Sequence, residues 1–335
     1  MICMDRETMS ISDQLPETVS WLFDNDPLAA PNVETRARLL FLDTLGCMIA
    51  GLDKPEPKAL ARDLAALEPG IVRLPTAPSM TAGAAATIAG LAACWDEACE
   101  GLPRAHGRPG LHAFAAALPL GLARDHSLGE TLSALVAGFE VAGRLGECLR
   151  IRPGMHVDGT WGTFGAVAAA ARLLGLDTEQ TAMAISLGAS QSSGLRQNFG
   201  TMTKPFHAGH ACKSGITAAK LVRGGFTAGT DALEGRFGFM RAFSGGNDYD
   251  PEKAAQSLGN RCFIIESGIE IKKYPCCGSA HLALDATTAL QQRETLEAAN
   301  IERIEVRVDF DPPRSLIHSR PKEGLEGKFS MQYCL

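Results

Sequence analysis

The sequence of 335 residues has no excess of positive charge and few large aromatic side chains. Asp plus Glu exceed Lys plus Arg by 38 to 32, so a nucleic-acid-binding surface built on surplus positive charge is excluded. Only three Trp and three Tyr stand against 35 glycines in an alanine-rich chain, which indicates helices packed closely through their backbones. With 45% hydrophobic and 21% charged residues, the chain can bury about three-quarters of its unfolded surface, which excludes wholesale disorder.

The N-terminus also lacks an apolar run behind a basic cluster, so neither a secretory signal nor a typical transit sequence is indicated. The uncharged stretch 74–95 contains Pro75 and Pro78. It is rich in Ala, Gly and Thr where a membrane-spanning helix needs Leu, Ile and Phe. We therefore expect a cytoplasmic protein without a membrane partner, whose ten cysteines are reduced thiols.

Apolar residues recur at helical spacing through most of the first 260 residues. Capping-box spacing at Ser127 and Asp177, and the proline after Asp250, are typical of helix starts. Stretches such as 165–171 are nearly free of charge, so these helices must be surrounded by others. The predicted helices cover residues 33–50, 82–95, 112–124, 131–149, 162–174, 179–189, 211–223 and 251–258.

The pattern changes near residue 262. Residues 263–265 and 268–274 have short-period β character, a helix is expected over 279–292, and residues 304–310 alternate like a half-buried strand. The predicted fold class is mainly α, with a large all-α domain over 1–264 and a smaller α+β domain over 265–327.

Familiar nucleotide and metal motifs fail on spacing. Gly327-Lys328 lacks the upstream glycine and the Ser/Thr of a P-loop. His207, His210 and Cys212 could share one helical face, but no fourth metal ligand is evident. We expect no metal and no cofactor.

Ionisable residues stand at the ends of the predicted helices in otherwise apolar surroundings. They include Asp96, His112, His156 and Lys204, and Lys204 is expected in a loop because Pro205 disfavours helix at the preceding position. Helix ends that meet in a bundle can enclose a cavity of low dielectric, where acids and bases titrate nearer neutrality. Each residue alone could equally be a satisfied structural group.

Five segments in order resemble the signatures of the MmgE/PrpD family. They are Phe41–Gly46, Gly162–Leu176, Ser190–Leu195 with Gly200–Gly209, Tyr274–His281 and Lys328–Tyr333. Members include 2-methylcitrate dehydratase, cis-aconitate decarboxylase and iminodisuccinate epimerase. The resemblance implies a cofactor-independent enzyme that moves protons beside a carboxylate of a small di- or tricarboxylate, with a helical domain, a smaller α+β lid domain and a homodimeric assembly.

Carried over by position, the resemblance implies a set of catalytic residues: Asp96, His112, His156, Lys204 and His281. Lys204 would anchor a carboxylate or stabilise an oxyanion, while His112 and His156 would form the acid/base pair. Asp96 would orient a histidine. The substrate-binding candidates are Lys204, His207, Arg104 and Arg108, although the two arginines could equally be solvated loop residues.

The chain departs from the family between Asp96 and His112, where it is longer than the usual acidic cluster and histidine-proline pair. His106 or Glu100 are therefore alternatives there. The lysine loop around Lys204 is closer to the decarboxylase and epimerase members than to methylcitrate dehydratases. We expect a lyase, either dehydratase or decarboxylase. The alternatives are an epimerase of an amino-dicarboxylate with two bases on opposite faces of one carbon, and an inactive helical scaffold or binding protein.

Residues 328–335 resemble the start of a segment that returns to the helical domain. From this resemblance we expect that the chain is truncated at its C-terminus. The domain over 265–327 would then be incomplete.

Overall fold

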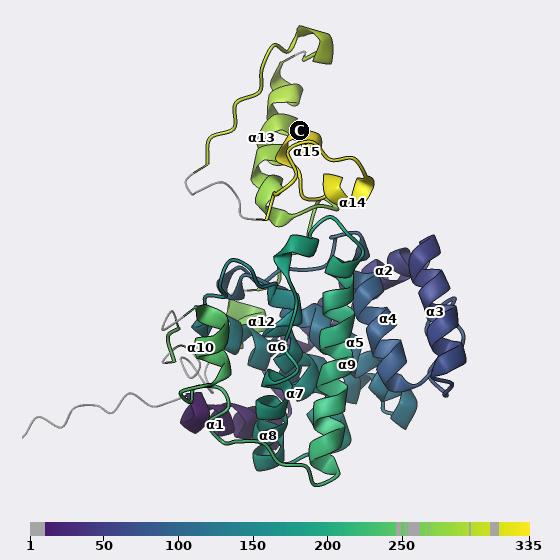
Figure 1. Cartoon of the computed structure of the whole chain (residues 1–335), viewed down its shortest axis with the longest axis vertical. Helices are drawn as coiled ribbons and strands as arrows, with labels where there is room; N and C mark the ends of the chain where they lie inside the picture. The colour runs from purple at the N-terminus through teal and green to yellow at the C-terminus, as the bar shows by residue number, and fades with distance from the viewer. Residues whose placement is uncertain are drawn as a thin grey trace, which may run out of the picture.

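The computed structural model describes residues 11–245, 249–251, 253, 262–266, 268–294, 296–308 and 315–335. It is mainly helical, as predicted (Figure 1). The α-helices are α1 (Ile11–Asp24), α2 (Val33–Leu52), α3 (Pro55–Leu67), α4 (Ala82–Trp95), α5 (Pro109–Arg124), α6 (Leu128–Cys148), α7 (Gly162–Leu174), α8 (Thr178–Ala189), α9 (Thr203–Arg223), α10 (Phe239–Ser244), α12 (Phe263–Glu266), α13 (His281–Arg293), α14 (Gly324–Gly327) and α15 (Met331–Cys334). Short 3₁₀ turns are η1 (Pro27–Ala29), η2 (Pro103–Ala105), η3 (Val157–Gly159), η4 (Arg196–Asn198), η5 (Gly278–Ala280) and η6 (Ala298–Asn300).

Two of the predicted helix starts are confirmed. Ser127 and Asp177 each form a complete capping box, at the starts of α6 and α8. The helices α1 and α3 were not predicted. In α3, Pro55 and Pro57 fit because both stand in the first turn, whose N–H groups need no helical acceptor. The helix expected over 251–258 lies almost wholly outside the described residues.

The prediction that Lys204 lies in a loop is wrong. Helix α9 begins at Thr203, eight residues earlier than expected, so Lys204 and Pro205 belong to its first turn. A proline is tolerated there because the missing N–H has no partner within the helix. Lys204 thus stands on a rigid element at the helix N-terminus.

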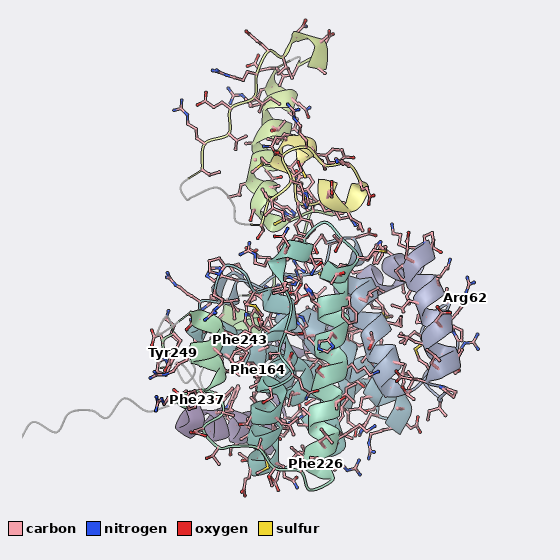
Figure 2. All side chains as sticks on the ribbon, in the orientation of Figure 1. Arg62, Phe164, Phe226, Phe237, Phe243 and Tyr249 are labelled. Carbon is pink, nitrogen blue, oxygen red and sulfur yellow. The ribbon has the colours of Figure 1, made fainter. Side chains whose placement is uncertain are left out.

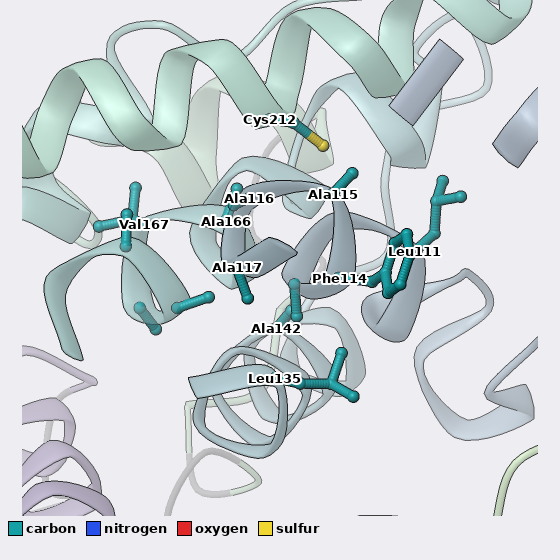
Figure 3. Packing of buried hydrophobic residues seen from close by; sticks show 14 of the residues in the cluster. Leu111, Phe114, Ala115, Ala116, Ala117, Leu135, Ala142, Ala166, Val167 and Cys212 are labelled. Carbon is teal, nitrogen blue, oxygen red and sulfur yellow. The ribbon is translucent and has the colours of Figure 1, made fainter. Parts of the chain in front are cut away.

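The core of the helical body is built from α4, α5, α6, α7 and α9, whose facing side chains are mostly small. Figure 3 shows Ala115 and Ala116 of α5, Ala166 of α7 and Ala142 of α6 close together, with Cys212 of α9 nearby. Small side chains let helix backbones approach closely, which explains why a chain poor in large aromatics forms a dense core.

One group of aromatic residues lies at the edge of this body around α10. Figure 2 shows Phe164, Phe243 and Tyr249 near α10. The Phe239 ring stacks on Phe243 with centroids 4.5 Å apart and meets the edge of Phe164 at 4.8 Å. These contacts fix the short helix α10 against α7.

Beyond residue 262 the expected β character is not seen. Residues 263–266 form helix α12, because Phe263 and Ile264 are buried and the Ile264 N–H donates to the buried Glu140 carboxylate on α6 at 3.1 Å. Residues 304–308 are exposed and form no strand, and the part of the chain that the structure describes contains isolated β-bridges but no sheet. The α+β character of this region therefore stays a prediction.

The C-terminal helices α13, α14 and α15 stand together on the end of the helical body at which α9 begins (Figure 1). A small apolar cluster joins the two parts: Phe199 of the body packs with Cys277 and Phe329 of the C-terminal region. The Phe199 and Phe329 ring centroids are 5.0 Å apart. The residues discussed next lie at this junction.

Candidate active site

Ionisable side chains that are buried or nearly buried come together where the helical body meets the C-terminal region. We call this set the charge cluster; it consists of Cys94, Glu97, Arg108, Asp158, Lys204 and Lys272. Its members come from the end of α4, the segments before α5 and around η3, the start of α9 and the segment before α13. A buried charge is stable only when it has a partner, so the ion pairs and hydrogen bonds of each member determine its position and its protonation state.

The close crossing of α4 and α9 brings two members of the charge cluster, Cys94 and Lys204, together. Gly90 and Gly209 face each other there, and a Cβ atom at Gly209 would lie 2.3 Å from the Thr87 carbonyl oxygen. This approach carries Cys94, at the end of α4, to the start of α9, where its Sγ lies 3.2 Å from Lys204 Nζ.

Glu97 holds three cations at once. Its carboxylate pairs with Lys204, with Arg108 Nη2 at 2.8 Å and with Lys272 Nζ at 3.5 Å. Its carbonyl oxygen also accepts a hydrogen bond from Lys272 at 2.6 Å. The Glu97 backbone is left-handed, with φ of 56°, so this side chain is positioned by an unusual turn directly after α4.

Asp158 joins the cations to a histidine. Its Oδ2 lies 2.7 Å from Arg108 Nη1, 3.1 Å from His156 Nε2 and 3.7 Å from Lys204 Nζ. Burial alone would raise the pKa of Asp158, but Arg108 and His156 hold it well below the usual carboxyl range. Asp158 is therefore an anion that fixes the His156 ring.

His156 continues the chain of contacts to His207 on α9. The two Nδ1 atoms are 2.9 Å apart, so one ring donates the single shared proton and the other accepts it. Burial and the neighbouring His156 lower the pKa of His207 to about 4. His207 is thus neutral near pH 7.

Cys94 and Lys204 also influence each other's protonation. A hydrogen bond from Cys99, followed by the charges of Lys204 and Arg108, holds the pKa of Cys94 well below the usual thiol value against the effect of burial. Burial lowers the pKa of Lys204 to about 8, opposed by Cys94. With Cys94 as a thiolate, the charge cluster has three anions, which are Cys94, Glu97 and Asp158. They balance its three cations, which are Arg108, Lys204 and Lys272.

The structure brings four of the predicted site residues to this place: His156, Lys204, His207 and Arg108. His112 is adjacent, since its Nδ1 lies 2.8 Å from the Arg108 carbonyl oxygen. Its ring packs on Gly162, burial lowers its pKa, and its Nε2 has no hydrogen-bond partner among the described residues.

The other predicted site residues have their partners outside the charge cluster. Asp96 pairs with Lys54 and Lys328 at 3.1 and 3.0 Å, so the carboxylate that orients a histidine is Asp158 instead. Arg104 is held by Glu147 and lies over the Phe263 ring. His281 is half-buried, with its Nε2 3.3 Å from the Cys276 carbonyl oxygen.

Neither alternative in the altered segment joins the charge cluster through a direct contact either. His106 is exposed and ends η2 in a left-handed conformation. Glu100 is fully buried and accepts a hydrogen bond from the Leu111 N–H at the start of α5. Burial raises its pKa to about 7.

Sequence reasoning missed Cys94, Glu97, Asp158 and Lys272. Asp158 carried a usable signal, since it is an acid two residues after His156 at the entrance to an uncharged helix. Lys272 carried none, because its partner Glu97 is 175 residues away.

Two cavities lie elsewhere. One of about 590 Å³ lies between the ends of α1 and α7 and the start of α6 and is lined by His126 and Arg172 among others. The other, of about 460 Å³, lies beside α3 and α9. Within the described residues, no group of three or more His, Cys, Asp or Glu side chains could hold a metal ion.

None of the helices described is long and apolar enough to cross a membrane.

Comparisons with known proteins place these residues in a family. The chain is 28% identical over 340 residues to the cis-aconitate decarboxylase of Aspergillus terreus, covering 91% of this chain and 67% of the relative. It is 27% identical over 313 residues to a cis-aconitate decarboxylase-like protein of Aspergillus oryzae, covering 85% and 64%. The human cis-aconitate decarboxylase is 30% identical over 210 residues, covering 60% and 42%. The chain thus spans about two thirds or less of the length of these curated relatives.

Family models cover most of the chain. The model of the MmgE/PrpD N-terminal domain matches residues 24–252, and that of the MmgE/PrpD C-terminal domain matches residues 274–335. The relatives support a lyase, and the two matches show that the chain belongs to the MmgE/PrpD family.

Proposed function

We propose that this chain is a cofactor-independent decarboxylase of a small di- or tricarboxylate, which works by proton transfer next to a carboxylate. The observation that carries the proposal is the convergence of Arg108, Lys204 and Lys272 on one buried place beside the His156–Asp158 pair. The three cations bind the carboxylates of the substrate, and the His156–Asp158 pair transfers protons.

The cations suit a substrate with more than one carboxylate. Arg108 presents both Nη atoms to carboxylates, one on Glu97 and one on Asp158, in the planar geometry that favours carboxylate recognition. Glu97 shows how a carboxylate fits between Arg108, Lys204 and Lys272. In a buried setting these contacts also stabilise the negative charge that develops when a carbon–carboxylate bond breaks.

Proton transfer falls to the residues next to the cations. Asp158 holds His156 through Nε2, and His207 shares a proton with its Nδ1, so the ring is oriented from both sides. The His112 ring supports Arg108, because its Nδ1 contacts the Arg108 backbone carbonyl oxygen. We propose that Asp96, Arg104 and His281 position the C-terminal region around the site.

Decarboxylation is preferred to dehydration because the three relatives reported above are named for decarboxylation of cis-aconitate. A tricarboxylate of that kind is the first substrate to test.

We further propose that residues 265–327 form a smaller α+β lid to the helical domain of residues 1–264, and that residues 328–335 return toward that domain. We also propose that the protein is a cytoplasmic homodimer.

A ligand screen followed by product analysis tests the function. At 100 times its dissociation constant, a true ligand stabilises the protein by about 2.7 kcal/mol, which a thermal-shift screen of di- and tricarboxylates would detect. NMR in deuterated water then follows each hit. Release of CO₂ with one solvent deuterium in the product supports the proposal. Loss of water indicates a dehydratase, inversion with deuterium wash-in indicates an epimerase, and failure of every carboxylate to bind indicates a scaffold; each of these results overturns it.

A further inference from the structure

Cys94 occupies the centre of the charge cluster. Its Sγ lies 3.2 Å from Lys204 Nζ and 3.3 Å from Arg108 Nη1, and 3.8 Å from carboxylate oxygens of both Glu97 and Asp158. The side chain is fully buried. This sulfur thus lies between the two cations proposed to hold substrate carboxylates, so a carboxylate bound to them would stand beside it.

The surroundings favour a thiolate on Cys94 and a thiol on its neighbour Cys99. Lys204 from α9 and Arg108 from the segment before α5 both face the sulfur, at 3.2 and 3.3 Å. A hydrogen bond from Cys99 is the largest of the influences that lower the pKa of Cys94. The pKa of Cys99 is raised well above the usual value, first by that hydrogen bond and then by burial. A thiolate with a depressed pKa is an acid/base group poised to gain and lose a proton.

We propose that Cys94 is a catalytic residue that delivers the proton to the reacting carbon, an inference that rests on the proposed function. A bound polycarboxylate adds negative charge to an electrically balanced cluster, so the thiolate takes up a proton and becomes a thiol. Asp158 lies between the sulfur and His156, at 3.8 and 3.1 Å, and in this proposal the pair passes the proton to the sulfur.

The step balances without any oxidant or further reactant. The bond between the carbon and its carboxylate breaks, CO₂ leaves, and the electron pair stays on the carbon beside Lys204 and Arg108. The S–H bond of Cys94 then breaks as the new C–H bond forms. The sulfur returns to a thiolate, and one proton from water restores the thiol in the next cycle.

The first experiment measures the thiolate itself, independently of turnover. The ultraviolet absorbance of thiolate is followed between pH 4 and pH 8 in the wild type, Cys94→Ser and Cys47→Ser. Cys47 is the matched control, because burial raises its pKa to about 12 and it carries no thiolate in this range. We expect a thiolate signal at pH 7 in the wild type and in Cys47→Ser that Cys94→Ser lacks. Equal absorbance in all three proteins overturns the proposal.

The second experiment measures proton delivery. With a carboxylate that the wild type decarboxylates, Cys94→Ser should lower kcat by about 10²-fold or more, the range of general acid catalysis, while ligand affinity changes less than 10-fold. Cys94→Asp should recover part of kcat, since a carboxylate can carry a proton where a serine hydroxyl cannot. Circular dichroism establishes folding, and Cys94→Ala replaces any variant that fails to fold.

The outcomes separate the two proposals. A Cys94→Ser protein with kcat within a few-fold of Cys47→Ser overturns the role of Cys94 and leaves the decarboxylase intact. A wild type that turns over no polycarboxylate overturns the proposed function and this inference with it, even if the thiolate signal is present.

Discussion

Asp158, absent from our sequence-based site, joins the cations of the charge cluster to His156. It neutralises Arg108 and fixes His156, and it is fully buried. Removing one partner of a buried ion pair costs about 3–5 kcal/mol because the other charge is left uncompensated. We expect Asp158→Asn to lose stability of this order and to lower kcat by about 10²-fold, measured by urea unfolding and steady-state kinetics.

Asp96→Asn is the matched control for stability. The Asp96 carboxylate is 26% exposed, and its partners Lys54 and Lys328 can turn toward solvent. We expect a loss of about 1 kcal/mol or less. Equal destabilisation by the two substitutions would contradict the assignment of Asp158 as the central buried anion.

Glu100 provides a test of pH dependence at a single buried carboxyl. Burial raises its pKa to about 7 from 4.5, so between these values the folded state binds more protons than the unfolded state, and stability falls as pH rises. Its Oε2 has no hydrogen-bond partner among the described residues. Glu100→Gln should therefore stabilise the protein at pH 8 by up to about 3 kcal/mol and leave it nearly unchanged at pH 4. Urea unfolding at both pH values measures this, and a difference that does not depend on pH would refute it.

At the scale of elements, the crossing of α4 and α9 sets the geometry of the site. Because a Cβ at Gly209 would meet the Thr87 carbonyl oxygen, Gly209→Ala must push the helices apart and separate Cys94 from Lys204. We expect a loss of about 1–3 kcal/mol together with a fall in kcat, measured by urea unfolding and steady-state kinetics.

Gly46→Ala on α2 is the matched control for that crossing. Nothing lies within 4 Å of a Cβ atom there, so the change should stabilise the protein by about 0.5–1 kcal/mol through helix propensity. Equal effects of the two substitutions would show that the crossing is not tightly packed.

The elements also show what the sequence could predict. Helices α6 and α8 were predicted because their apolar spacing and their capping residues Ser127 and Asp177 are local signals. The start of α9 was missed because proline disfavours helix at the preceding residue in general but is tolerated in a first turn. Residues 263–266 form a helix because of distant contacts with α6, which local periodicity cannot reveal.

The site was predictable only in part for the same reason. His156 and Lys204 were identified through their segments, and both lie in contact with Asp158. The pairs that complete the site join residues far apart in the chain, such as Cys94 with Lys204, 110 positions apart. Which carboxylates belong to the site depends on burial and on ion pairing, and the sequence shows neither. Asp96 was therefore chosen, whereas Glu97 and Asp158 form the ion pairs with Arg108.

At the scale of the whole molecule, charge balance predicts proton uptake when substrate binds. A dicarboxylate brings two negative charges to a cluster whose cations are already matched, so the Cys94 thiolate should gain a proton. Calorimetry at pH 7 to 8 in buffers of different ionisation enthalpy should show about one proton taken up per ligand, with weaker binding as pH rises. The uptake should fall in Cys94→Ser, and a binding heat that is the same in every buffer would contradict the account.

The central claim is that the buried charge cluster is the site of a decarboxylase, and Lys204 tests it most directly. The measurement is CO₂ release from carboxyl-labelled cis-aconitate and related tricarboxylates by the wild type, Lys204→Met and Lys213→Met. Lys213 stands on the same helix but pairs with Glu68 at the surface. The account predicts release by the wild type and Lys213→Met, with a fall of at least about 10²-fold in Lys204→Met. Release by Lys204→Met at the wild-type rate would contradict it.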